Sequence, residues 1–131
     1  MTTLQKALTA NASCSSLSGL IMIVGHQQLA TLFQVSNAMP FWIIGILLLF
    51  FALTIVIEIK PQRIKAVWWI IIQDVLWVVG SIVLLLLQPW GISTIGNMMI
   101  GGMAALVFFF AYWQYQGIQA LKQNLSSGAL N

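Results

Sequence analysis

The sequence predicts an all-α protein: a bundle of four transmembrane helices in up-down-up-down order, with a short interfacial helix between the first and the second. Three observations predict this fold class. Of the 131 residues, 60% are hydrophobic and 5% are charged, whereas a soluble domain carries about 25% charged residues. Four segments have the ~20 mostly apolar residues that a helix needs to cross the hydrocarbon. The basic residues all fall on one side of the resulting topology, as in membrane proteins generally.

Each predicted span has its own sequence signals. The first, 4–24, is the least hydrophobic because a serine-rich stretch interrupts it. The second, 40–59, begins with Pro40, whose missing N–H costs nothing in a first turn. The third, 64–87, follows after little more than the letters KPQ. The fourth, 92–118, follows QPWG, with Ser93 or Thr94 available as a cap. Because both connections are short, we expect the second, third and fourth helices to form a tight antiparallel unit.

The remaining segments are short. Between the first two spans, Leu29, Leu32 and Phe33 recur at helical spacing among polar residues, which predicts a short helix lying flat at the membrane surface. Residues 119–131 are predicted to form a flexible tail. The length leaves no room for a second, soluble domain, so we expect a single membrane domain over 1–131.

The basic residues predict the orientation, because Lys and Arg concentrate on the cytoplasmic side of membrane proteins. One lies at the start of the first span, three surround the connection between the second and third, and one follows the fourth: Lys6, Lys60, Arg63, Lys65 and Lys122. The other two connections carry none. Both termini are therefore predicted to face the cytoplasm.

One of the two acidic residues, Asp74, lies in the middle of a predicted span. It stands about ten residues into the third helix, which is ~15 Å from that end at the helical rise per residue and so near the bilayer midplane. A charge there costs ~2.5–3.5 kcal/mol on insertion scales. We therefore expect Asp74 to point into the bundle or into an oligomer interface. No basic residue lies at this depth, and burial without a cation favours the neutral acid.

Polar side chains of two helices are expected to meet at Asp74. On the first helix they are spaced i, i+4 and i+7, and on the third they follow Asp74 at similar steps, so each set shares one helical face. The candidates for a buried polar or proton-linked site are Asp74, Ser15, Ser18, Asn11, Trp77 and Ser81. Small residues let helix backbones approach closely, and the predicted packing positions are Gly19, Gly101 and Ala105.

Two roles for Asp74 stay open. As a functional group it would be a carboxylate that couples to protons or cations, because ionisable residues inside membranes are commonly functional. As a structural group it would be a protonated acid that forms hydrogen bonds to serines between helices. The serines of the first helix could line an aqueous cavity, but their spacing favours close packing.

Other chemistry finds little support in the sequence. His26 at the outer boundary is a weak ligand candidate, because no second ligand matches it. No Cys/His set has metal-binding spacing, so we expect no metal and no cofactor. No nucleophile, base or second buried carboxylate completes a catalytic set, so we expect no enzyme. A basic cluster with interleaved aromatics is also missing, so nucleic acid is not an expected partner.

The stretches NASCSSLSGL in the first helix and QDVLWVVGS in the third resemble a group of small bacterial four-span integral membrane proteins with no assigned activity. The residues that carry the resemblance are Asn11, Ser16, Ser18, Gly19, Asp74, Trp77, Gly80 and Ser81. The resemblance implies a four-helix fold and brings no activity. Together with the charge pattern, it leads us to expect a multi-pass protein of the bacterial inner (plasma) membrane.

The function that these observations favour is a non-enzymatic structural or accessory subunit. It would pack in a homo-oligomer or a larger membrane complex, with the lipid bilayer as its surroundings. The alternative is a small oligomeric proton-coupled transporter or channel that uses Asp74 with Ser15 and Ser18. A third possibility is a protein that binds a lipid, a quinone or a pigment near Trp77.

Overall fold

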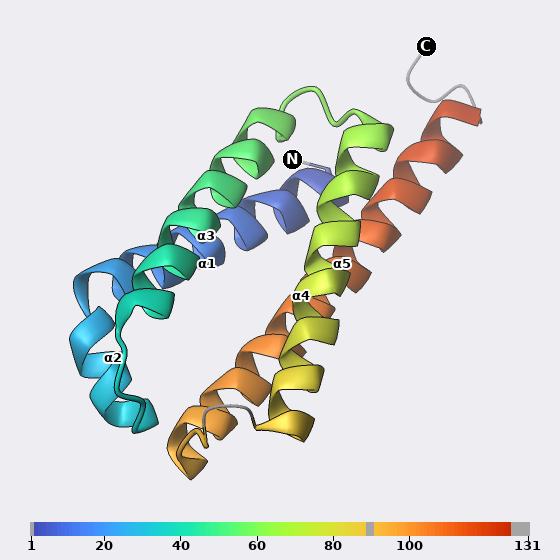
Figure 1. The fold of residues 1–131 in the computed structure, drawn as a ribbon. Helices are drawn as coiled ribbons and strands as arrows, with labels where there is room; N and C mark the ends of the chain where they lie inside the picture. Colours follow the sequence, from blue (N-terminus) through green and yellow to red (C-terminus); the bar gives the residue numbers. More distant parts are fainter. Residues whose placement is uncertain (1, 89–90, 127–131) are drawn as a thin grey trace.

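The computed structural model describes residues 2–88 and 91–126, which form helices joined by short connections (Figure 1). The helices are α1 (Thr3–Val24), α2 (His26–Phe33), α3 (Met39–Glu58), α4 (Ile64–Leu87) and α5 (Thr94–Ser126). The described residues contain no strand. Four of these helices are long and apolar enough to cross a membrane, so the chain is a multi-pass membrane protein. The predicted all-α class and the short helix after the first span are confirmed.

The start of α1, the turn between α3 and α4, and the end of α5 all lie at one end of the molecule, the upper end in Figure 1. The basic residues lie in these segments or, for Lys65, in the first turn of α4, so we refer to this end as the charged end. Side chains at the start of α1 bind the turn. Thr2 Oγ1 donates to Gln62 Oε1 at 2.6 Å, and Gln5 Nε2 donates to the Ile59 carbonyl at 3.0 Å.

The helices pair differently from the expectation. α3 packs mainly on α1, α4 packs on α5, and α1 also packs on α5. α3 and α4 make few contacts and diverge from their shared turn (Figure 1), so the predicted tight unit of the second, third and fourth spans is wrong in this respect. The physical reason lies at Gly19 and Gly45, where a Cβ added to either would lie 2.8 Å from the carbonyl oxygen of the other. Two glycines facing each other bring α1 and α3 into a contact that no other residue type allows.

The hydrophobic core lies in the half of the bundle nearer the charged end. It combines the first turns of α1 and α4 with the last turns of α3 and α5, and its fully buried members are Leu4, Leu8, Ile55, Val67 and Ile118. At Gly117 an added Cβ would lie 2.6 Å from the Leu4 Cα. α1 and α5 therefore touch backbone to backbone beside the core.

α5 is longer than the predicted fourth span, since it continues from 118 to Ser126. Its 33 residues correspond to about 50 Å, whereas the hydrocarbon core measures about 30 Å. The extension has a packing reason, because Leu121 contacts the core. Residues 119–126 are thus helical instead of a flexible tail, and 127–131 lie outside the described residues.

At the opposite end, α2 is bound to the start of α5. Ser93 N donates to the Phe33 carbonyl at 2.9 Å and Ser93 Oγ donates to the Leu32 carbonyl at 2.7 Å. Ser93 also caps α5, because Gly96 N donates to its hydroxyl at 3.1 Å. The Phe33 ring is buried against Gly96. Part of the apolar stripe of α2 therefore packs on the protein.

Candidate functional site

A cluster of buried polar side chains joins three helices around Asp74. Asp74 Oδ2 accepts hydrogen bonds from Asn11 Nδ2 of α1 at 2.9 Å and from Gln114 Nε2 of α5 at 2.7 Å. Asn11 Nδ2 also lies 3.2 Å from Gln114 Oε1, to which it donates. Ser15 Oγ donates to Asn11 Oδ1 at 3.3 Å. We call these four residues, Asp74, Asn11, Gln114 and Ser15, the Asp74 cluster.

The cluster is closed to its surroundings. Asp74 is 2% exposed, Asn11 1% and Gln114 0%. Among the described residues, no buried side-chain nitrogen or oxygen lacks a hydrogen-bond partner. Because unpaired polar groups are costly in an apolar interior, the hydrogen bonds among Asp74 Oδ2, Asn11 and Gln114 stabilise the cluster at its position.

Residue counts along two helices place the cluster near the middle of the spans. Counted from the charged end, Asp74 lies ten residues after Ile64 and Asn11 eight after Thr3. At the helical rise per residue these separations are ~15 and ~12 Å, about half the thickness of a hydrocarbon core of about 30 Å. Gln114 lies at the same level, because its Nε2 donates to Asp74 Oδ2 at 2.7 Å. We therefore expect the cluster near the bilayer midplane.

Each member of the cluster occupies a position on the buried stripe of its helix. On α1 the buried stripe consists of Leu4, Leu8, Asn11 and Ser15. On α4 it consists of Val67, Ile70, Ile71 and Asp74. On α5 it consists of Phe110, Ala111, Gln114, Gly117 and Ile118. These residues recur at steps of three and four, which is the spacing of one helical face. The polar residues thus face one another for the same reason that the apolar residues of these stripes form the core.

The bond between Asn11 and Asp74 bridges two helices whose backbones are not adjacent. No Cα atom of α1 comes within 8 Å of a Cα atom of α4. The amide of Asn11 and the carboxyl of Asp74 therefore reach across a wider separation, beside Gln114 of α5. The cluster supplies a side-chain link between α1 and α4 where backbone packing does not.

Of the polar candidates chosen from the sequence, the structure brings Asn11 and Ser15 to Asp74. Ser18, Trp77 and Ser81 lie farther along α1 and α4, are half-buried, and donate no hydrogen bond to the cluster. The Ser81 hydroxyl instead donates to the Trp77 carbonyl of its own helix at 2.8 Å. Such bonds within a helix satisfy a serine without binding a neighbouring helix.

The packing candidates differ in their surroundings. Gly19 lies in the tight contact with Gly45 described above. At Gly101 the nearest neighbour of an added Cβ is Leu85 Cδ1 at 4.0 Å, and Ala105 is exposed. The close approach of α5 to the rest of the chain is made at other positions, Gly96 and Gly117.

Gln114 is the member of the cluster that the sequence reasoning missed. The predicted fourth span ended at 118, which placed Gln114 near the membrane boundary, where a polar side chain needs no explanation. Its sequence signal was a single amide between residues that are apolar or glycine at i−4, i−3, i+3 and i+4. On a helix that continues to Ser126, this position lies in the middle of the bundle.

The weak ligand candidate, His26, lies half-buried at the start of α2, with its Nδ1 2.8 Å from the Ile23 carbonyl oxygen. The described residues contain no group of three or more His, Cys, Asp or Glu that could hold a metal ion. His26 therefore has no ligand set around it in the described part of the chain.

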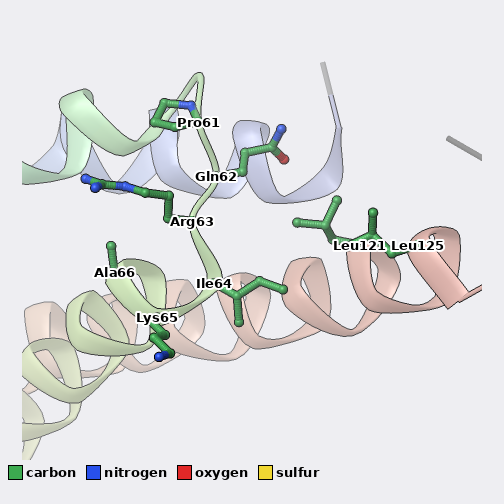
Figure 2. Close-up of a pocket in the computed structure, with 8 residues that line it drawn as sticks. All are labelled: Pro61, Gln62, Arg63, Ile64, Lys65, Ala66, Leu121 and Leu125. Atoms are coloured by element: carbon green, nitrogen blue, oxygen red, sulfur yellow. The ribbon is translucent and has the colours of Figure 1, made fainter. Parts of the chain in front are cut away.

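The other acid, Glu58, lies at the charged end and is 4% exposed. Its carboxylate accepts hydrogen bonds from Nε and Nη2 of Arg63, whose own side chain is largely exposed. These bonds raise the pKa of the Arg63 guanidinium. Beside this pair, residues 61–66, which run from the α3–α4 turn into the first turn of α4, and the last turns of α5 line an open hollow of about 670 Å³ (Figure 2). Its lining includes Leu121 and Leu125 but no member of the Asp74 cluster.

Comparison with family models, with curated proteins and with solved structures finds no match for this chain. Asp74 accepts hydrogen bonds from two neutral amides, and none of its partners among the described residues is a cation. This arrangement suits an acid that holds helices together.

Proposed function

We propose that the protein is a non-enzymatic structural or accessory subunit of the bacterial inner membrane, with both termini in the cytoplasm. One observation carries the proposal. The carboxyl group in the middle of the spans is 2% exposed, and Oδ2 accepts two hydrogen bonds from two other helices. A group that exchanges protons or ions needs a path to water, whereas a group that joins helices needs burial and hydrogen bonds to those helices, as described here.

The exposed surface supports the same proposal. Large apolar side chains cover the outward faces of α3 and α4, including Phe50, Trp69 and Leu76 at 68%, 62% and 63% exposure. Such faces meet lipid or other membrane helices. A small bundle of this kind, with an internally satisfied polar centre and apolar outer faces, is suited to packing in a larger membrane assembly.

The second candidate is the proton-coupled transporter or channel. It is favoured by a single fact, namely that an acid near the midplane has no cationic partner within the described chain. Such an acid could gain and lose a proton if the bundle opened. The transporter requires a titratable carboxyl group at position 74, whereas the structural subunit does not. Asp74→Asn replaces this carboxyl group with an amide of nearly the same shape.

The test combines proton flux with assembly. Wild-type protein and Asp74→Asn are reconstituted into vesicles that contain a pH-sensitive dye, and the same variants are purified in mild detergent to compare the masses of their complexes. The structural proposal predicts flux no higher than in protein-free vesicles and the same complex mass for both proteins. Flux that is present in the wild type and lost in Asp74→Asn would contradict it and support the transporter.

A further inference from the structure

α4 carries a stripe of exposed and half-buried residues spaced by three and four along its whole length. Positions Ala66, Gln73, Gly80 and Leu87 are spaced by seven, and Trp69, Leu76 and Val83 fall between them at steps of three and four. The three intermediate residues are 62%, 63% and 47% exposed. This spacing is the a/d heptad pattern with which one helix packs along another in a left-handed pair. We call these positions the α4 seam.

Gln73 is the polar residue of the seam. It lies nine residues after Ile64, at ~14 Å from the charged end and so near the midplane. Its side chain is half-buried and forms no hydrogen bond with any part of the chain that the structure describes. Acyl chains offer an amide neither donor nor acceptor, and an unpaired polar group in hydrocarbon costs several kcal/mol. Gln73 therefore needs a partner from outside the described chain, unlike the apolar residues around it.

The neighbouring seam positions leave room for another helix. At Gly80 an added Cβ would meet nothing within 4 Å, and Ala66 occupies the corresponding position one heptad earlier than Gln73. Small residues on both sides of a polar one are the combination that lets two membrane helices approach and then form a hydrogen bond. Inside the chain, α4 meets α5 and part of α3, and the seam stays exposed beside these contacts.

We propose that the α4 seam binds the α4 seam of a second copy of this chain, in a parallel two-fold pair in which the two Gln73 amides form hydrogen bonds with each other. A second copy inserted in the same orientation presents an amide at the depth where Gln73 needs one. An amide is both donor and acceptor, so it complements itself across a two-fold axis, where each residue meets its own equivalent. A single polar a position also fixes the register of such a pair. This inference rests on the proposed function, for which it names the partner.

Cysteine cross-linking in native membranes tests the pair. In a Cys14→Ala background, Leu76→Cys places a thiol on the seam, and Val75→Cys places one at the same depth on a different face. Both positions are exposed, at 63% and 44%. After mild oxidation we expect a disulfide-linked dimer of this chain for Leu76→Cys and none for Val75→Cys. Equal cross-linking of both variants, or no dimer for either, would overturn the proposal.

The role of Gln73 is tested in the Leu76→Cys protein. Hydrogen bonds between membrane helices contribute about 0.6 to 2 kcal/mol, so Gln73→Leu should weaken dimerisation about threefold to thirtyfold, while Gln73→Asn should largely retain it. Because Gln73 forms no hydrogen bond within the described chain, both variants should fold, and tryptophan fluorescence checks this. Undiminished cross-linking in Gln73→Leu would overturn the proposal. A Leu76→Cys cross-link to a different protein would also overturn the dimer proposal, but it would leave the proposed accessory function in place. That function would instead be contradicted by a proton flux that the wild type shows and Asp74→Asn lacks.

Discussion

Replacing Asp74 with leucine is expected to lower the free energy of unfolding by about 1 to 3 kcal/mol. The magnitude follows from the cluster. Asp74 Oδ2 accepts two hydrogen bonds from other helices, at 2.9 and 2.7 Å, and such bonds contribute about 0.6 to 1.7 kcal/mol each in membrane proteins. Leucine removes the acceptor, so Asn11 and Gln114 lose their hydrogen bonds to residue 74 and keep the one between them. Asp74→Asn keeps an oxygen that accepts both bonds, so this variant should lose less than half as much free energy of unfolding as Asp74→Leu.

The assay is reversible unfolding of the purified protein in mixtures of a mild and a denaturing detergent, followed by tryptophan fluorescence. Val75→Leu serves as the control, because residue 75 is next to Asp74 on α4 but 44% exposed, and we expect it to leave stability unchanged. The outcome that refutes the reasoning is an Asp74→Leu protein as stable as Asp74→Asn. Buried polar networks are sometimes replaced by apolar residues without loss, and in that case the cluster would not hold the bundle together.

Further outcomes follow from other contacts. Gly19→Ala should destabilise the bundle, because its Cβ would lie 2.8 Å from a carbonyl oxygen of α3. Gly102→Ala, whose Cβ would have nothing within 4 Å, should not. Equal stability of the two variants in the same assay would contradict the close contact between α1 and α3. Gln114→Leu should lose about 0.6 to 2 kcal/mol, and a loss near zero would remove α5 from the cluster. In a cysteine-free background, a thiol-reactive probe that cannot cross membranes should label Ser36→Cys but not Lys60→Cys on intact cells, and the reverse pattern would invert the orientation.

The fold class could be predicted from the sequence because the bilayer imposes strong requirements. A spanning helix must be long and apolar, and each of the four such segments in the sequence is a helix in the structure. The pairing of the helices could not be predicted, because apolar faces look alike in a sequence. The close approach of Gly19 and Gly45 lets α3 pack on α1, but the sequence does not show which helix either glycine contacts.

The site could be predicted in part for a similar reason. Asp74 stood out because an acid near the midplane is costly, and Asn11 and Ser15 shared a helical face at a matching depth. Gln114 was missed because its depth depends on how far α5 continues, and α5 continues past 118, with Leu121 packed against the core. Ser18 and Ser81 lie at the predicted spacing, but spacing alone does not reveal that α1 and α4 diverge away from the charged end (Figure 1).

A double-mutant cycle between Asn11 and Asp74 tests most directly whether the cluster joins α1 to α4. These two side chains bind each other at 2.9 Å across helices that have no Cα atoms within 8 Å of each other. Stabilities of Asn11→Leu, Asp74→Leu and the double variant, compared with the wild type, give the coupling between them. We expect a favourable coupling of about 0.6 to 1.7 kcal/mol. Strictly additive losses, with no coupling, would contradict it.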